Sequence, residues 1–220
     1  MTTSKIKALL LLTLACCASH VAAQLEVNMR KIGAKDVAAM YKNKQFGAAR
    51  EMAVQCADQQ LDKECQRMAA ELLMDGASGP EDPARALDYL LKSAKQEHPA
   101  SQALLGNMYH NGNGVTKDTA EALKWWERSA ENCNTWAQNA VARSYFDGAI
   151  VVKDEVRALY WVSVAAYFRF PNADTGVAHI STLLTPKQRG EAQSKTDSFI
   201  KNSGCGTSKP VVIYEPGAKA

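Results

Sequence analysis

The chain has 220 residues, 46% of them hydrophobic and 22% charged, a composition that excludes a largely disordered protein. Its formal net charge is +3, and removing Lys5 and Lys7 with residues 1–23, which contain no acid, leaves 3 − 2 = +1. Binding to a phosphate backbone depends on clustered lysine and arginine. We therefore expect no nucleic-acid partner.

Residues 1–23 are typical of a secretory signal peptide. Lys5 and Lys7 flank the start of an apolar run over residues 6–18, and small residues lead to Ala23 before Gln24. This pattern predicts cleavage after Ala23. The mature protein is then periplasmic or secreted and has no integral membrane segment.

Two other interpretations of this segment stay open. A retained membrane anchor is disfavoured because the apolar run is shorter than the ~20 residues of a spanning helix. A lipoprotein needs a lipid-acceptor cysteine at Cys16 or Cys17, and Thr13 stands where an aliphatic residue is usual.

The centre of the chain repeats itself at a constant step of 36 residues, without gaps. Two features recur at this step, an acidic or amide residue followed by glycine and an aspartate seven residues further on. They are Asp75-Gly76, Asn111-Gly112 and Asp147-Gly148, followed by Asp82, Asp118 and Asp154. A fixed period of this size is typical of stacked repeats, in which each unit buries its apolar face against its neighbours.

The copy over residues 100–130 predicts two helices. Residues 100–109 have large apolar side chains at helical spacing, and Gly112 suits a left-handed helix cap. The second helix begins after Asp118, whose carboxylate caps the first turn, with Glu121 placed as in a capping box. Gly106 occupies a position at which the other copies also have a small residue, so the two helices can approach closely.

The pattern resembles a known family. The stretches Ala100-Ser-Gln-Ala-Leu-Leu-Gly-Asn-Met-Tyr109 and Glu121-Ala-Leu-Lys-Trp-Trp-Glu-Arg-Ser-Ala130, joined through Asn111-Gly-Asn-Gly-Val-Thr-Lys-Asp118, resemble a Sel-one-like repeat (SLR), which is related to the tetratricopeptide repeat. The resemblance implies an all-α, right-handed α-α superhelix, a solenoid of antiparallel helix pairs that serves as a scaffold for protein contacts.

The ends of the chain predict degenerate units around these repeats. We expect a tetratricopeptide-like helix pair over 24–62, the 36-residue repeats over 63–168, capping helices over 169–202 and a flexible tail over 203–220. Thr185, Pro186 and Gln188 stand as N-cap, first-position proline and box residue of a helix that runs to about Asn202.

Four cysteines remain after signal cleavage, an even number in an exported chain. Cys56 and Cys65 lie at the end of one predicted helix and the start of the next, so their side chains are expected to meet across the turn. Related secreted repeat proteins place bridges at a similar junction, although the spacing here is longer by about one residue. Cys133 and Cys205 are then left to pair, and the alternatives are free thiols or a bond between two chains.

The resemblance also implies that the first helix of each unit lines the concave side of the superhelix. Beside the buried stripe at Leu105, Gly106 and Tyr109, this places Ala103, Asn107 and His110 on that side. One period away on either side the equivalent positions are Arg67, Glu71, Met74, Asn139, Arg143 and Phe146. These residues form the candidate binding groove, and the alternative is an ordinary solvated face.

Sites for chemistry are sparse. His98, His110 and His179 are isolated and no cysteine spacing fits zinc, so we expect neither metal nor cofactor. Ser198-Phe-Ile-Lys201 matches the Ser-x-x-Lys arrangement of penicillin-binding enzymes, but the accompanying elements are missing. The four tryptophans suggest either a ligand platform or, more simply, packing between units.

The resulting hypothesis is a non-catalytic, exported helical-repeat scaffold or adaptor that binds a protein or peptide. Within that class the protein stabilises a periplasmic complex or neutralises a toxin. The alternative is a cell-wall-directed hydrolase or a penicillin-binding, β-lactamase-like protein that uses Ser198 and Lys201.

Overall fold

A computed structural model describes residues 32–59 and 61–205. The predicted signal peptide and residues 206–220 of the predicted tail lie outside this part of the chain. The described residues form ten α-helices and no strand. The helices are α2 (Ala34–Lys42), α3 (Phe46–Gln59), α4 (Lys63–Met74), α5 (Pro83–Lys95), α6 (Pro99–Asn111), α7 (Thr119–Glu131), α8 (Thr135–Asp147), α9 (Glu155–Tyr167), α10 (Ala173–Leu183) and α11 (Pro186–Asn202).

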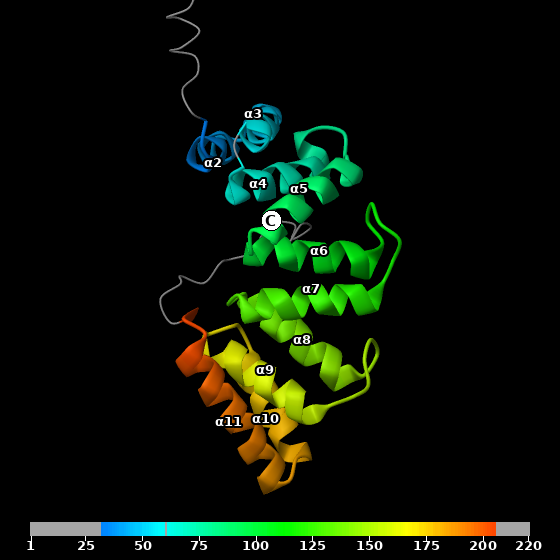
Figure 1. Cartoon of the computed structure of the whole chain (residues 1–220), viewed down its shortest axis with the longest axis vertical. Helices are drawn as coiled ribbons and strands as arrows, with labels where there is room; N and C mark the ends of the chain where they lie inside the picture. The colour runs from blue at the N-terminus through cyan, green and yellow to red at the C-terminus, as the bar shows by residue number, and fades with distance from the viewer. Residues whose placement is uncertain (1–31, 60, 206–220) are drawn as a thin grey trace, which may run out of the picture.

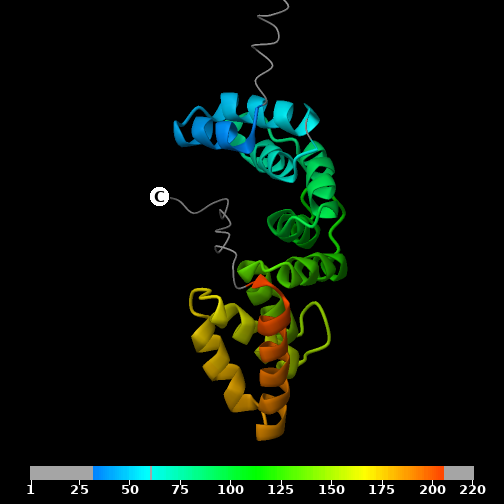
Figure 2. The ribbon, with the colours of Figure 1, turned by 60° about the vertical axis from the view of Figure 1, so that its left-hand side comes forward.

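Consecutive helices pack against each other along the repeat array. The pairs α4 and α5, α6 and α7, and α8 and α9 form the three repeat units, and α3, α5 and α7 each pack on the first helix of the next unit. Figure 1 shows the units stacked along the long axis, and Figure 2 shows that the stack follows a curve open on one side. Both α10 and α11 pack on α9 and close the end of the array. Within the described residues, every helix is too short or too polar to span a bilayer.

Local signals set the helix ends. The Asp82, Asp118 and Asp154 carboxylates each accept a hydrogen bond from the amide three residues later, which confirms the predicted caps. Gly112 ends α6 in the left-handed conformation, with φ of 82°.

The predicted capping box at Glu121 is wrong. A box needs the Glu121 carboxylate to accept from the Asp118 amide, but that amide donates to the Tyr109 carbonyl at 2.9 Å. The Glu121 carboxylate pairs instead with Lys124, 2.9 Å away. The start of α7 is therefore capped by the Asp118 side chain alone.

The unit interiors depend on one close helix approach. A Cβ on Gly106 of α6 would lie 2.2 Å from the Trp126 ring of α7, so only glycine fits at this position. Leu105 and Val141 are fully buried in the layers on either side. The small residue predicted at this position of the repeat therefore allows the close approach of α6 and α7.

In the first two units, a serine of the second helix forms a hydrogen bond with the start of the first helix of the same unit. The Ser93 hydroxyl of α5 donates to the Lys63 carbonyl at 2.7 Å, and the Ser129 hydroxyl of α7 donates to the Pro99 carbonyl, also at 2.7 Å. Ala165 holds the third position of this series, 36 residues further on, and cannot form the bond. The third unit thus lacks a polar tie that the first two units share.

A row of buried glutamines follows the same step of 36 residues. Gln66, Gln102 and Gln138 are at most 1% exposed. The side-chain carbonyl of Gln66 accepts from the Gln96 side-chain amide, and that of Gln102 accepts from the Asn132 side-chain amide, at 2.9 and 3.0 Å. The next position in the donor series is Phe168, which has no side-chain amide, and the Gln138 side-chain carbonyl has no partner among the described residues.

This difference predicts unequal costs for the same substitution. We expect Gln102→Met to lower the free energy of unfolding by about 1–2 kcal/mol, because it removes two hydrogen bonds, one of them from Asn132. Gln138→Met removes one bond together with an unpaired carbonyl, so its cost should stay below about 1 kcal/mol. Urea unfolding of both variants measures the difference. Equal losses would show that the bond from Asn132 to Gln102, within the second unit, does not contribute to stability.

Two disulfides join segments of the described chain. Cys56 in the last turn of α3 is bonded to Cys65 in the first turn of α4, and their Cα atoms are 5.7 Å apart. Cys133, between α7 and α8, is bonded to Cys205, three residues beyond α11. The second bond joins residues 72 positions apart and holds α11 to the middle of the chain.

Candidate functional site

The candidate residues lie on the first helices of the three units, α4, α6 and α8. We refer to the partly exposed side chains of these three helices as the first-helix face. Eight predicted residues belong to it: Arg67, Glu71, Met74, Asn107, His110, Asn139, Arg143 and Phe146. Ala103 does not, because its side chain is fully buried between α6 and its neighbours, and its prediction as a surface residue is wrong.

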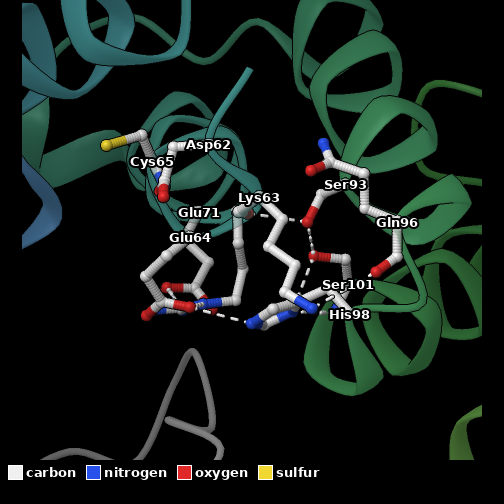
Figure 3. Close-up of polar contacts among 10 residues, drawn as sticks. Asp62, Lys63, Glu64, Cys65, Glu71, Ser93, Gln96, His98 and Ser101 are labelled. Carbon is white, nitrogen blue, oxygen red and sulfur yellow. Dashed lines mark hydrogen bonds and ion pairs between the residues drawn. The ribbon is translucent and has the colours of Figure 1, made fainter. Parts of the chain in front are cut away.

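A charged cluster occupies the α4 end of this face. The Arg67 guanidinium, whose side chain is 17% exposed, forms ion pairs with Glu64, at 2.5 Å, and with Glu71. The His98 ring at the start of α6 donates through Nε2 to Glu64 at 2.8 Å, a contact drawn in Figure 3. The cluster therefore joins the first turns of two neighbouring units.

Backbone geometry fixes the proton on His98. The Ser101 amide donates to His98 Nδ1, so Nε2 carries the proton that Glu64 accepts. This hydrogen bond, opposed by burial and helped by Arg67, lowers the pKa of Glu64 to about 2. Glu64 is thus a carboxylate at any physiological pH. Glu64, Arg67 and Glu71 together carry a charge of −1, and Lys63 in the first turn of α4 balances it.

Aromatic side chains occupy the middle of the face. The Trp126 ring reaches from α7 to α6, where its Nε1 donates to the Asn107 side-chain oxygen at 3.1 Å. His110 and Trp136 both pack against it, with ring centroids 5.2 and 5.9 Å from that of Trp126. The His110 Nδ1 atom is buried and has no hydrogen-bond partner among the described residues. Asn107 is therefore committed to Trp126, and His110 and Trp136 are the partly exposed members of this row.

Aromatic and cationic side chains occupy the α8 end of the face. Phe146 packs edge-on against His179 of α10, at 5.6 Å between ring centroids, and the Lys153 ammonium lies 5.2 Å from the centre of the same ring. Arg143 is exposed and Asn139 is half-buried. This end of the face is cationic and aromatic, in contrast to the α4 end, where carboxylates and cations are paired.

The residues considered for catalysis are not assembled into a reactive centre. The Ser198 hydroxyl accepts from the Asn202 side chain at 3.3 Å, and Lys201 is exposed near the end of α11. Within the described residues no base lies within hydrogen-bond reach of this hydroxyl, so nothing in the geometry activates it as a nucleophile.

The histidines are equally separate. His98 caps the start of α6, His110 lies near the end of the same helix, and His179 lies on α10. Residues 32–59 and 61–205 contain no group of three potential metal ligands.

Comparison with known protein families identifies the repeats. The Sel1 repeat matches residues 63–98, 99–132 and 137–167, which correspond to the helix pairs α4–α5, α6–α7 and α8–α9. Residues 63–167 contain three Sel1 repeats. A search of curated proteins found no match.

Solved structures share the fold of this chain. A Sel1 repeat protein from Oxalobacter formigenes aligns with a TM-score of 0.62 and 22% identity, over 77% of this chain and 70% of its own. The protein c5321, a protective antigen of uropathogenic Escherichia coli with an SLR fold, aligns with a TM-score of 0.54 and 21% identity. That alignment covers 78% of this chain but only 46% of the E. coli protein, so this chain spans about half its length. At these identities the likeness shows the fold alone.

Sequence reasoning misses several residues that shape the site. Glu64 and His98 are 34 residues apart, and the repeat pattern places neither on the face, although Glu64 stands one turn before Arg67. Trp136 gives no sequence signal beyond its size. The glutamine row is readable from the sequence, because Gln66, Gln102 and Gln138 keep the spacing of the Sel1 repeats.

Proposed function

We propose that this protein is a non-catalytic, exported scaffold that binds a protein or an extended peptide through its first-helix face. One observation carries the proposal. Three helices spaced one repeat apart present different chemistry in sequence: a network of paired charges at Glu64, Arg67 and Glu71, an aromatic row at His110 and Trp136, and a cationic end at Arg143. Such a graded surface suits an elongated partner that contacts several units at once.

The fixed positions of side chains on the first-helix face also support a role in binding. Arg67 is held by two carboxylates and Asn107 by the Trp126 indole, so these side chains are already ordered. A partner then loses less free energy in ordering the surface that it binds. These ordered side chains, together with a Ser198 hydroxyl that contacts no base, favour recognition over the hydrolase alternative.

Two features support export. The signal-peptide pattern of residues 1–23 predicts secretion, and the four remaining cysteines are bonded in two pairs. Disulfides persist in oxidising compartments and are rare in the cytosol. We therefore place the protein in the periplasm or outside the cell, where it stabilises an envelope complex, acts as an adaptor or neutralises a toxin.

Co-purification tests the binding face. We expect the double variant Glu71→Lys/Arg143→Glu to lose the partners that the mature wild-type protein retains, with at least a roughly tenfold fall in recovery, because each substitution reverses a charge at one end of the face. Quantitative mass spectrometry of the captured proteins gives the measurement. Thermal melting should accompany it, since Glu71→Lys also breaks the ion pair with Arg67.

A matched control reverses two exposed charges elsewhere. Asp88→Lys on α5 and Lys124→Glu on α7 change side chains that are 60% and 69% exposed, both on second helices. This control should keep the wild-type partners. An unchanged partner set in Glu71→Lys/Arg143→Glu, with both variants folded, would remove the first-helix face as the binding surface.

A further inference from the structure

A pocket of about 470 Å³ lies where α7, α9 and α11 meet, on other helices than the first-helix face. In Figures 1 and 2 the C-terminal end of α11 lies beside α7. The pocket combines aromatic rings with polar side chains. Its lining residues are Glu131, Tyr160, Lys195, Ser198, Phe199, Asn202 and Ser203.

A disulfide holds two edges of this pocket together. Glu131 ends α7 and stands two residues before Cys133. Ser203 follows α11 and stands two residues before Cys205, to which Cys133 is bonded. The covalent bond therefore keeps the end of α7 next to the end of α11. The two edges of the pocket are already in place before a ligand arrives, which lowers the cost of binding.

The aromatic wall of the pocket is equally well packed. Tyr160 and Trp161 of α9 have ring centroids 4.6 Å apart, and the Phe199 ring of α11 lies 5.5 Å from Trp161 and 6.3 Å from Tyr160. Trp161 is buried, whereas Tyr160 and Phe199 are partly exposed and line the pocket. These two rings offer apolar surface to a ligand.

Three polar groups of the lining have unused hydrogen-bonding capacity within the described residues. The Glu131 carboxylate is exposed and has neither an ion pair nor a hydrogen bond there, and the Tyr160 hydroxyl has no hydrogen bond there. The Ser198 hydroxyl accepts from the Asn202 side chain at 3.3 Å, so its own hydrogen is available to a ligand. An apolar wall with a few convergent polar groups is the usual form of a small-molecule site.

The charges of the lining residues favour one sign of ligand. Lys195 forms an ion pair with Glu191 at 2.9 Å, so its charge is compensated on α11 itself. Burial, followed by the negative charge of Glu131, raises the pKa of Tyr160 to about 12, so the phenol is neutral. The uncompensated charge among the described lining residues is therefore the negative charge of Glu131.

A carboxylate beside aromatic rings is suited to a cation that also carries carbon groups. The face of an aromatic ring attracts a cation through its quadrupole, and ammonium groups are bound in this way. An anionic ligand would meet the repulsion of Glu131, and a purely apolar one would take water from its carboxylate without replacing it.

We propose that this pocket binds a small organic ammonium ion, whose charge faces Glu131 and whose carbon groups pack on Tyr160 and Phe199. The Ser198 hydroxyl donates to a polar group of the ligand, which gives this serine a binding role in place of a catalytic one. A free amine and the lysine side chain of another protein share this chemistry, and the choice of probes separates the two sources.

NMR titration of the oxidised protein starting at Gln24, at constant ionic strength, tests the site. The probes are choline, its neutral isostere 3,3-dimethylbutan-1-ol, and Nα-acetyl-lysine amide. We expect choline to bind with a Kd on the order of a millimolar and to shift the amides of Tyr160, Ser198 and Phe199. The isostere should bind about tenfold more weakly, because it lacks the charge. Binding of the lysine probe in preference to choline would assign the site to a protein side chain.

Substitutions locate the site. Glu131→Gln should weaken choline binding about tenfold, and Tyr160→Leu should weaken it as well, because the variants remove the carboxylate and one ring. Glu121→Gln, at the other end of α7, is the matched control and should bind choline like the wild-type protein. Circular dichroism checks the fold of each variant. If Tyr160→Leu fails to fold, Glu131→Gln decides, since that side chain is exposed.

Three results would each overturn the proposal. They are equal affinity for choline and its neutral isostere, unchanged choline binding in Glu131→Gln, and amide shifts that lie outside the pocket. None of them bears on the proposed function of the first-helix face, which uses other helices.

Discussion

Gly106→Leu will lower the free energy of unfolding by about 3 kcal/mol, since overpacking a well-packed interior costs about 1–3 kcal/mol and this site has no free volume. A Cβ at position 106 already lies 2.2 Å from the Trp126 ring, whose Nε1 is tied to Asn107. The ring must move, and the contact between α6 and α7 opens. For a chain of this size the melting temperature should fall by about 6–12 °C, measured by circular dichroism.

Gly190→Leu provides the matched comparison. Gly190 lies in α11, is exposed, and has no neighbouring atom within 4 Å of the position that a Cβ would occupy. Leucine forms helices better than glycine, so this variant should melt at or slightly above the wild-type temperature. Identical melting of Gly106→Leu and the wild-type protein would contradict the packing of α6 on α7 described above.

Much of the fold is predictable because its signals are local or repeat at a fixed step. The Asp118 cap, the left-handed Gly112 and the box at Thr185 each involve residues within four positions of one another. The small residue at position 106 is predictable because the other repeats also place a small residue there. Periodicity does not determine which partner a side chain binds. The sequence pattern predicts that the Glu121 carboxylate accepts from the Asp118 amide, but it pairs with Lys124.

The first-helix face is predictable only in outline, because its geometry depends on contacts between units. Helical spacing places Ala103 on the same side as Asn107, yet Ala103 is fully buried by the neighbouring helices. The sequence indicates a free polar group at Asn107, but its oxygen accepts from Trp126 of the partner helix. His98 reaches Glu64 across a unit boundary, 34 residues away, and no local pattern indicates that contact.

The packing of the end units also depends on contacts that the sequence does not reveal. Thr185, Pro186 and Gln188 predict the start of α11, but only the structure shows that α10 and α11 both pack on α9. The third unit has Ala165 and Phe168 in place of the polar groups that join the two helices within each of the first two units. Those groups join the two helices within a unit, so the pairing of α8 with α9 depends more on apolar packing. The disulfide between Cys133 and Cys205 adds a covalent link from α11 to the turn before α8.

Removing that disulfide should have the largest effect on stability. The double variant Cys133→Ser/Cys205→Ser should lose about 4 kcal/mol, because the bond closes a long loop with a separation of 72 residues and so restricts the unfolded chain. Urea unfolding of the oxidised proteins gives the loss. Hydrogen exchange should show the greatest fall in protection in α11, which the bond ties to the turn before α8.

The second disulfide is the matched control for this prediction. Cys56→Ser/Cys65→Ser opens a loop with a separation of only 9 residues, so chain entropy predicts a smaller loss of about 3 kcal/mol, with exchange rising in α3 and the start of α4. Wild-type protein treated with a thiol reductant should lose stability at both ends of the array. If opening the Cys133–Cys205 bond leaves both unfolding and α11 protection unchanged, the bond does not hold the C-terminal helices to the third unit. The attachment of α11 would then depend on its packing against α9 alone, through residues such as Phe199 and Trp161, whose ring centroids are 5.5 Å apart.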